Sequence, residues 1–457
     1  MDSEEGAYLK PVDDVLFARL QMAFSLGFHI VFAAIGIAMP LLMVFAERLW
    51  MKTGDREYYE LTKAWAKGTA ILVAIGAASG TVLSFELGLL FPTFMRHAGP
   101  VISMPFSMEG FAFFAEAIFL GIYLYAWNRI SPRLHILSGV LVALAGALSA
   151  VFVITANAWM NYPKGFRIAE DGTFTDISPV SAMLNPYAIH EIAHMLVAAY
   201  LSTGILVAAI HAFILLRRPT STIHRKAFGL AMAMVIPTAI LQPVVGDLSA
   251  RQVARYQPLK FAAMEGQFRT EAHAPLRLGG IPDPEAMETR WALEVPGFLS
   301  FLGYGRASAE VKGLEEWPRE DWPHPVIVHL GFQIMVICGL VLLAVALWAL
   351  FHWLFKGRRL PDSRPFLWAT VIAGPLGMIA IEAGWIVTEV GRQPWVIYEI
   401  MRTKESATPM PGMIVPFIVT LLVYLGLSAA VILVMYRQIR IGPGVPGAAV
   451  PAGGKAK

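Results

Sequence analysis

The sequence predicts an all-α, polytopic membrane protein with nine transmembrane helices, its N-terminus outside the membrane and its C-terminus inside. Of the 457 residues, 56% are hydrophobic and only 15% are charged, whereas a soluble domain has roughly 25% charged residues. The apolar residues gather in long runs, and about 20 of them in a helix cross a bilayer core about 30 Å thick. Composition and run length therefore both indicate a bundle of membrane helices.

Six of the apolar runs lie within residues 1–248 and three within 325–437. The segment 249–324 between them is rich in Pro, Gly and charged residues, and a loop of this length is usually functional or disordered. The segment 438–457 is rich in Pro and Gly and is expected to be a flexible cytoplasmic tail. The expected spans are 16–46, 64–91, 106–127, 134–159, 187–215, 227–248, 325–354, 366–389 and 412–436.

The orientation follows from the basic residues in the loops. The loops after spans one, three, five and seven hold fifteen Lys and Arg residues, whereas 92–105, 160–186 and 390–411 hold six. Loops rich in Lys and Arg stay in the cytoplasm. The N-terminus and the long segment 249–324 are therefore expected outside, and nine spans return the C-terminus to the inside.

Composition also excludes several classes of function. The net charge of +3 is small and lies mostly in the loops, so nucleic acid is not an expected partner. The single cysteine, Cys338, excludes intramolecular disulfides and disfavours iron–sulfur or cysteine-based zinc sites.

Ionisable residues inside membrane spans are costly and are candidates for function. Glu109 and Glu116 are seven residues apart, which places them on one face of a helix, and they are expected to open the third helix. Such a pair can snorkel and hydrogen bond at the interface, or it can act as a proton relay or metal ligand. The candidates within spans are His29, Glu86, Glu109, Glu116, His194, Glu382 and Glu389.

Residues 190–194 read "HEIAH", the H-E-x-x-H spacing of many zinc proteases. An intramembrane zinc site would need a third ligand, and Asp247 is the only plausible donor. A haem-binding or ion-translocating site explains more of the candidate residues, because His and Met are a common axial pair for low-spin haem and Glu or His can hold a high-spin haem.

Several motifs resemble one family, subunit I of the cytochrome bd-type quinol oxidases, across all nine predicted spans. The most specific is "TEVGRQPW" at 388–395. The shortness of the outer loop resembles the short Q-loop branch, which includes cyanide-insensitive oxidases. The other matching stretches are "RLQMAFSLGFH" (19–29), "SGTVLSFELG" (79–88), "FSMEGFAFFAEA" (106–117), "NAWMNYP" (157–163), "LNPYAIHEIAH" (184–194), "VGDLSA" (245–250), "LKFAAMEGQF" (259–268) and "FQIMVICG" (332–339).

The resemblance implies three haems: two haem b and one haem d, or a third haem b in place of haem d. It implies that His194 and Met335 ligate the low-spin haem b. His29 and Glu389 are implied as axial ligands of the two high-spin haems, without an assignment of which residue holds which haem. Glu109 is implied as a further ligand or proton donor there, and Glu109 and Glu116 as the last proton-transfer residues.

The resemblance also implies that Lys260 and Glu265 bind quinol in the long outer loop, the Q-loop of this family. Arg392 and Trp395 are implied to hold haem propionates or to have a structural role, since a guanidinium matches a carboxylate well. Gln333 departs from the pattern, because better-known members have Arg at this position. The implied partners are a second membrane subunit, with or without a small accessory subunit.

The implied activity is oxidation of ubiquinol or menaquinol at the outer face of the bacterial cytoplasmic (inner) membrane, with reduction of O2 to water. This would build a proton gradient without pumping. The alternatives are a membrane haem protein that transfers electrons without reducing oxygen, and the intramembrane zinc metalloprotease suggested by "HEIAH".

Overall fold

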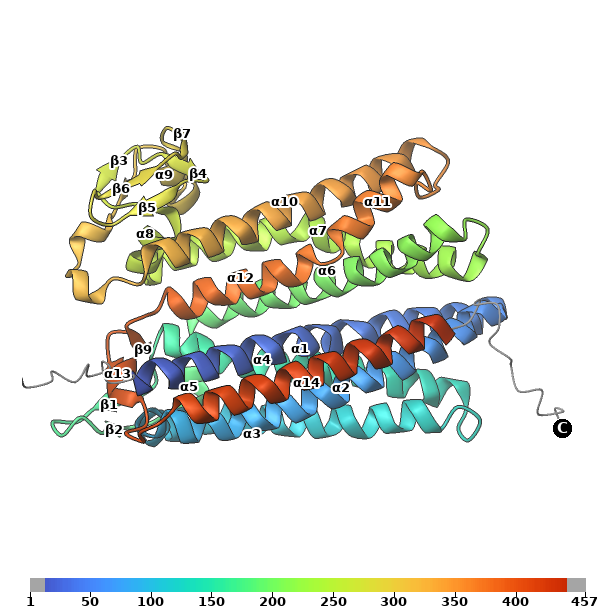
Figure 1. Ribbon diagram of the computed structural model, residues 1–457, viewed down its shortest axis with the longest axis horizontal. Coiled ribbons are helices and arrows are strands. Elements are labelled where there is room, and N and C mark those ends of the chain that lie inside the picture. Colours follow the sequence, from blue (N-terminus) through green and yellow to red (C-terminus); the bar gives the residue numbers. More distant parts are fainter. Residues whose placement is uncertain (1–12, 442–457) are drawn as a thin grey trace, which may run out of the picture.

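The computed structural model describes residues 13–441, and within this part nine helical segments are long and apolar enough to cross a membrane, as predicted (Figure 1). They are α1 (Asp14–Thr53), α2 (Arg56–Leu90), α3 (Pro92–Tyr125), α4 (Pro132–Asn161), α6 (Pro186–Arg217), α7 (Thr222–Tyr256), α10 (Pro325–Phe355), the pair α11 (Arg364–Ala373) and α12 (Leu376–Val390), and α14 (Ile414–Ile441). The predicted number of spans is confirmed, whereas several of their ends differ.

Local sequence explains where the helices begin. The Asn185 side chain accepts hydrogen bonds from the backbone N–H groups of Tyr187 and Ala188 and so caps α6, and the Asp13 side chain caps α1 in the same way. Proline suits the first helical turn, because its missing N–H has no partner to lose there. Prolines at this position include Pro92, Pro132, Pro186, Pro258 and Pro325.

The third helix begins fourteen residues earlier than predicted, and residues 92–105 are helical rather than an outer loop. Pro100 and Pro105 lie inside the helix, where a proline removes a backbone hydrogen bond. Burial of apolar side chains such as Phe94 and Val101 offsets this cost. The expectation that Glu109 and Glu116 open the helix is therefore wrong, since both lie in its second half.

The eighth span is broken into α11 and α12 at Gly374 and Pro375. A side chain at Gly374 would place its Cβ 2.6 Å from the Cβ of Ala209 in α6, so glycine permits close packing at the break. Helix α7 continues to Tyr256 and α14 to Ile441, beyond the predicted span ends. Residues 442–457, most of the predicted flexible tail, lie outside the described residues.

The long connection between α7 and α10, residues 257–324, is a folded unit rather than a disordered loop. We refer to it as the unit 257–324. It contains two short helices, three antiparallel strand pairs and two 3-10 turns, and buried Phe261, Phe268, Leu299 and Leu314 join it to the bundle. Its elements are α8 (Pro258–Glu265), α9 (Phe298–Tyr304), β3 (Glu271–Ala272) with β8 (Glu310–Val311), β4 (Leu276–Leu278) with β7 (Leu293–Val295), β5 (Ile281–Asp283) with β6 (Glu288–Arg290), and the turns Leu314–Glu316 and Arg319–Asp321.

Two smaller connections carry the remaining short elements. They are β1 (Arg167–Ile168) with β2 (Phe174–Thr175) and α5 (Pro179–Met183) between α4 and α6, and β9 (Trp395–Ile397) with β10 (Met401–Arg402) and α13 (Thr403–Ser406) after α12. All of these lie at the same end of the bundle as the unit 257–324 (Figure 1). The chain is thus mostly helical, as predicted, with strands confined to connections in the described part.

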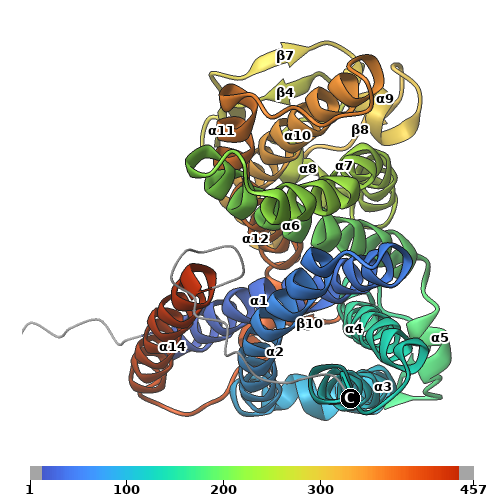
Figure 2. The same cartoon turned by 90° about the vertical axis from the view of Figure 1, so that its right-hand side faces the viewer.

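Seen along the bundle, the helices form two groups (Figure 2). Helices α1, α2, α3, α4 and α14 form one group, and α6, α7, α10, α11 and α12 form the other. Helices α1 and α4 of the first group both contact α6 of the second. Large apolar side chains such as Phe85, Phe111, Phe114 and Phe351 point outward, as expected for a surface in contact with lipid or another membrane subunit.

Candidate haem and quinol site

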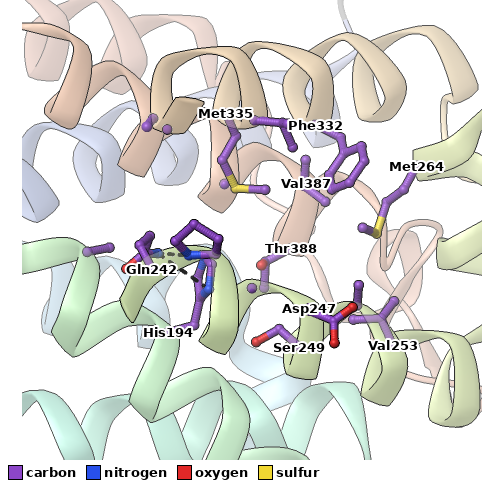
Figure 3. Close-up of a pocket in the computed structure, with 18 of the residues that line it drawn as sticks. His194, Gln242, Asp247, Ser249, Val253, Met264, Phe332, Met335, Val387 and Thr388 are labelled. Carbon is purple, nitrogen blue, oxygen red and sulfur yellow. Dashed lines mark hydrogen bonds between the residues drawn. The ribbon is translucent and has the colours of Figure 1, made fainter. Parts of the chain in front are cut away.

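A largely apolar cavity of about 420 Å³ lies in the second helix group, between α6, α7, α10 and α12, and it reaches α8 of the unit 257–324. His194 of α6 and Met335 of α10 line it from opposite sides, and the Met335 sulfur points toward the His194 ring (Figure 3). The sequence placed these two residues 141 positions apart, and the fold brings them to one cavity.

The His194 ring is held by its neighbours on α7. The Gln242 side-chain amide lies 3.3 Å from Nε2 and 3.4 Å from Nδ1 of the ring. A Cβ at Gly246 would lie 3.6 Å from the ring, and a Cβ at Gly384 would lie 3.0 Å from the Met335 sulfur. Because neither glycine has a side chain, the cavity keeps its space beside the His194 ring and the Met335 sulfur. An imidazole nitrogen and a thioether facing each other in an apolar cavity fit the axial ligands of a low-spin haem.

Arg392 lies beside this cavity and is almost fully buried, at 2% exposure. Its Nη2 donates to Glu389 at 2.6 Å, but its Nε and Nη1 have no hydrogen-bond partner in the described structure. Unsatisfied buried donors on a cation are costly. Haem propionates are carboxylates that would satisfy them, so the position of Arg392 fits its predicted role.

Glu389 follows Thr388, which lines the cavity from α12. Its carboxylate accepts hydrogen bonds from both Arg392 and Asn157 of α4. One carboxylate is therefore shared between the two helix groups. Trp395, the other residue predicted beside the propionates, begins β9, and its ring lies 4.7 Å from the Arg402 guanidinium.

Lys260 and Glu265 lie on α8, and both line the same cavity as His194 and Met335. The Lys260 ammonium donates to the side-chain oxygen of Asn161 at 2.7 Å. Burial, helped by the nearby Arg392 charge, lowers the pKa of Lys260 to about 7. Burial raises the pKa of Glu265 to about 8, against the opposing effect of Arg277. Both groups can therefore change protonation near neutral pH.

Glu191, the glutamate of "HEIAH", is a functional candidate that is missing from the residues selected by sequence. It lines the cavity, and one of its carboxyl oxygens is buried without a hydrogen-bond partner. Its carboxyl group interacts electrostatically with Lys260 and Arg392, and also with Glu389. Its place in the matching stretch "LNPYAIHEIAH" was the one signal that could have found it.

Gln333, the departure from the family pattern, connects α10 to the unit 257–324. Its amide nitrogen donates to the Arg277 carbonyl at 3.0 Å, and its oxygen accepts from the Gly279 N–H at 3.1 Å. His329, one turn earlier, contacts the carbonyls of Met264 and Gly279. Gln333, which stands where better-known family members have Arg, therefore holds the unit 257–324 against α10.

His29 lies in the first helix group, apart from the cavity. Its Nδ1 is 3.1 Å from the Ser79 hydroxyl of α2. A Cβ at Gly80 would come within 2.8 Å of the His29 ring, so α2 approaches the ring as closely as a glycine allows. Glu382 of α12 lies near this part of α1, with a carboxyl oxygen 3.1 Å from where a Cβ at Gly27 would be.

The remaining acidic candidates lie among α1 to α4. Glu86 accepts a hydrogen bond from the Gln21 amide at 2.7 Å. The Ser149 hydroxyl is 3.5 Å from the Glu109 carboxyl, and the Glu116 carboxyl faces Gly146. Glu109 and Glu116 do share one face of α3, as predicted, but the structure does not bring them to the 420 Å³ cavity.

The zinc hypothesis fails on its third ligand. Asp247 forms an ion pair with Arg251 at 2.9 Å, and the His190 ring lies 3.2 Å from the Ser249 hydroxyl. Within residues 13–441, no group of three or more His, Cys, Asp and Glu side chains is arranged to hold a metal ion. The described residues therefore supply no third ligand for a zinc ion at "HEIAH".

Known proteins match nearly the whole chain. The family model of cytochrome bd terminal oxidase subunit I matches residues 17–443. A Bacillus subtilis (strain 168) protein named putative cytochrome bd menaquinol oxidase subunit I is 37% identical over 437 residues, covering 94% of this chain and 98% of its own. The cytochrome bd-II ubiquinol oxidase subunit 1 of Escherichia coli (strain K12) is 28% identical, with 94% and 97% covered. 

A solved structure agrees with these relatives. The bd oxidase from Geobacillus thermodenitrificans superposes with a TM-score of 0.88 at 39% identity, and the match covers 94% of this chain and 99% of the solved one. The resemblance found in the sequence motifs is thereby confirmed, and the chain belongs to the cytochrome bd terminal oxidase subunit I family.

Proposed function

We propose that this chain is the subunit of a quinol:O2 oxidoreductase that oxidises quinol beside the unit 257–324 and carries the haems on which O2 is reduced to water. The observation that carries the proposal is the shared cavity, in which His194 and Met335 lie within one apolar space with Lys260 and Glu265. Related chains are named as menaquinol and ubiquinol oxidases, so either quinol is a candidate substrate.

The residues at α8 supply the acid–base chemistry of quinol oxidation. Each quinol releases two electrons and two protons. Lys260, with a pKa of about 7, is present in both forms at neutral pH, so its neutral amine can accept a proton from a quinol hydroxyl. Glu265, with a pKa of about 8, is mostly protonated at pH 7 and can donate a hydrogen bond to the other quinone oxygen. The unit 257–324 is thus the proposed quinol-binding Q-loop.

The ligand assignment follows the donor sets. His194 and Met335 would hold a low-spin haem b, and His29 and Glu389 would each serve one of two high-spin haems. Arg392 would bind propionates, and Glu109 would be a ligand or proton donor. When bound, two haem b with one haem d or a third haem b carry single electrons and bind oxygen.

The overall reaction balances as two quinols and one O2 giving two quinones and two waters. The four quinol protons leave at the outer face, and the four protons that form water enter from the cytoplasm through Glu116 and Glu109. This separates charge across the bacterial cytoplasmic membrane without a pump. The proposed partner is a second membrane subunit, with or without a small accessory subunit, on the apolar surface of the bundle.

The first experiment is the dithionite-reduced minus air-oxidised spectrum of the purified complex, with haem quantitation and quinol-driven oxygen uptake. We expect three haems per chain and oxygen consumption that depends on quinol. A far-red chlorin band would identify the third haem as d, and its absence would identify haem b. A haem-loaded complex that oxidises quinol only with another acceptor would overturn the proposal.

A further inference from the structure

Three polar residues of α3 lie on one face of the helix. Glu109, Glu116 and Tyr123 are spaced seven residues apart, which is two helical turns and about 10.5 Å for each step. We refer to these three residues as the α3 stripe. It runs along the helix away from the end that carries the unit 257–324.

Helix α4 presents small residues to the stripe. A Cβ at Gly139 would come within 2.7 Å of the Tyr123 ring, and a Cβ at Gly146 would lie 3.5 Å from the Glu116 carboxyl. The Ser149 hydroxyl reaches the Glu109 carboxyl. Because Gly139 and Gly146 have no side chains, the α4 backbone lies directly against the stripe.

A buried, hydrogen-bonded Glu–His pair lies at the end of the stripe. Glu47, in the last two turns of α1, and His135, in the first turn of α4, are 0% and 2% exposed, and the carboxyl oxygen is 2.7 Å from the ring Nδ1. The other ring nitrogen, Nε2, is 2.9 Å from the Tyr123 carbonyl oxygen. The carbonyl oxygen can only accept, so Nε2 donates to it, and Nδ1 and the Glu47 carboxyl group share one proton between them.

The pair also contacts the nearest residue of the stripe. The Glu47 carboxyl group interacts with the Tyr123 hydroxyl, in addition to its contact with His135. The buried carboxyl group therefore connects the His135 ring to the Tyr123 side chain, as a proton relay requires.

The position of the pair completes the argument. Glu47 and His135 lie at the end of the bundle opposite the unit 257–324, where α1 turns into α2 and α3 turns into α4 (Figure 1). The exposed Arg129 and Arg133 mark the aqueous surface beside them. The pair therefore stands between solvent on that side and the Tyr123 end of the stripe.

We propose that Glu47 and His135 form the intake of a proton path that continues past Tyr123 to Glu116 and Glu109. The inference rests on the proposed function, because it supplies the protons consumed in water formation. For each electron delivered to oxygen, the pair passes one proton toward Glu116 and regains one from solution, so its own charge is restored. The steps of about 10.5 Å exceed a hydrogen bond, so water carries the proton between stripe positions.

The test uses the complete complex, reduced with quinol and mixed rapidly with oxygen in weak buffer containing a pH dye. Haem absorbance and proton uptake are recorded together. Glu47→Gln removes the ionisable group and keeps the side-chain shape. We expect it to slow proton uptake at least about tenfold, with haem content and the first reaction with oxygen unchanged. Glu47→Asp should restore part of the rate, whereas a purely structural role predicts no change in uptake once the haems are in place.

A matched control comes from the same end of the molecule. His211 and His224 form another buried pair, with their Nδ1 atoms 3.0 Å apart, but they join α6 to α7 away from the stripe. His211→Gln should leave proton uptake at the wild-type rate. Equal slowing by His211→Gln and Glu47→Gln would overturn the proposal, since it would show a general effect of disturbing this end of the bundle.

Two further outcomes are decisive. If Glu47→Gln fails to assemble with haem, Tyr123→Phe replaces it, because this change removes only the hydroxyl, and wild-type uptake in that variant would overturn the path. If Glu47→Gln assembles and takes up protons normally, the inference fails while the oxidase function stands. A wild-type complex without quinol-driven oxygen uptake would instead refute the proposed function.

Discussion

Met335 and Met264 both line the cavity, but only the Met335 sulfur points at His194 (Figure 3). Met335→Leu keeps a similar volume and removes the donor atom. We expect the low-spin haem signal to disappear from the reduced-minus-oxidised spectrum while the high-spin signals persist. Met264→Leu is the matched control and should leave all haem signals in place. A Met335→Leu complex with an unchanged low-spin spectrum would remove Met335 from the ligand set.

Lys260 leads to a prediction about pH. Because burial lowers its pKa to about 7, the amine becomes neutral and able to accept a quinol proton as the pH rises through about 7. Quinol oxidation by the wild-type complex should therefore increase across this range. Lys260→Gln, which cannot accept the proton, should be slower and should lose this rising limb. The measurement is the initial rate of oxygen uptake at saturating quinol as a function of pH, and an identical limb in both proteins would contradict the role.

At the level of single residues, sequence could identify candidate ligands but not most of the side chains that surround them. Motifs led to His194 and Met335 because donor type and position within a span are visible in the chain. Glu191 was missed because its role depends on the charges of Lys260 and Arg392, which are 69 and 201 positions away. Contacts over such separations are decided by helix packing and cannot be read from local spacing.

At the scale of elements, the distance between neighbouring helices decides how much space is left beside a candidate haem ligand. Helix α2 meets the His29 ring at Gly80, where a Cβ would lie only 2.8 Å away, whereas a Cβ at Gly246 would be 3.6 Å from the His194 ring. Gly80→Ala should therefore push His29 out of position and weaken a high-spin haem signal and carbon monoxide binding. Gly246→Ala should be tolerated and keep the low-spin signal. Equal spectra for the two variants would show that the close approach has no effect on ligation.

The number of spans was predictable from hydropathy, but their ends were not. The third span was expected to begin at residue 106, whereas α3 begins at Pro92 and runs through Pro100 and Pro105. Neighbouring helices in a bundle compensate for the backbone hydrogen bonds that proline removes. The break at Gly374 and Pro375 was missed for the opposite reason, because the run stays apolar through the interruption and hydropathy does not change.

At the scale of the whole molecule, the polar features are divided between the two ends of the bundle. The cavity and the buried Lys260 lie at the end with the unit 257–324, and the Glu47–His135 pair lies at the other. Under the proposed function, this separation would let electrons enter on one side and protons on the other. Sequence indicated the division through the basic loops, but the two helix groups and any surface for a second subunit could only come from three-dimensional packing.

The predicted orientation can be tested with single cysteines on the complete complex in cells. Glu285, in the unit 257–324, and Arg56, at the start of α2, have 87% and 81% exposed side chains and lie at opposite ends. Cys338 is buried and is the one cysteine of this chain, so Cys338→Ala provides a background in which this chain has no thiol. Glu285→Cys should react with a membrane-impermeant maleimide added outside, and Arg56→Cys should react only after the membrane is opened.

The reverse labelling pattern would place the quinol site in the cytoplasm. Quinol protons would then be released on the side from which the water-forming protons are drawn, and turnover would build no gradient. The membrane side on which Glu285 and Arg56 each lie therefore decides whether turnover can build a proton gradient.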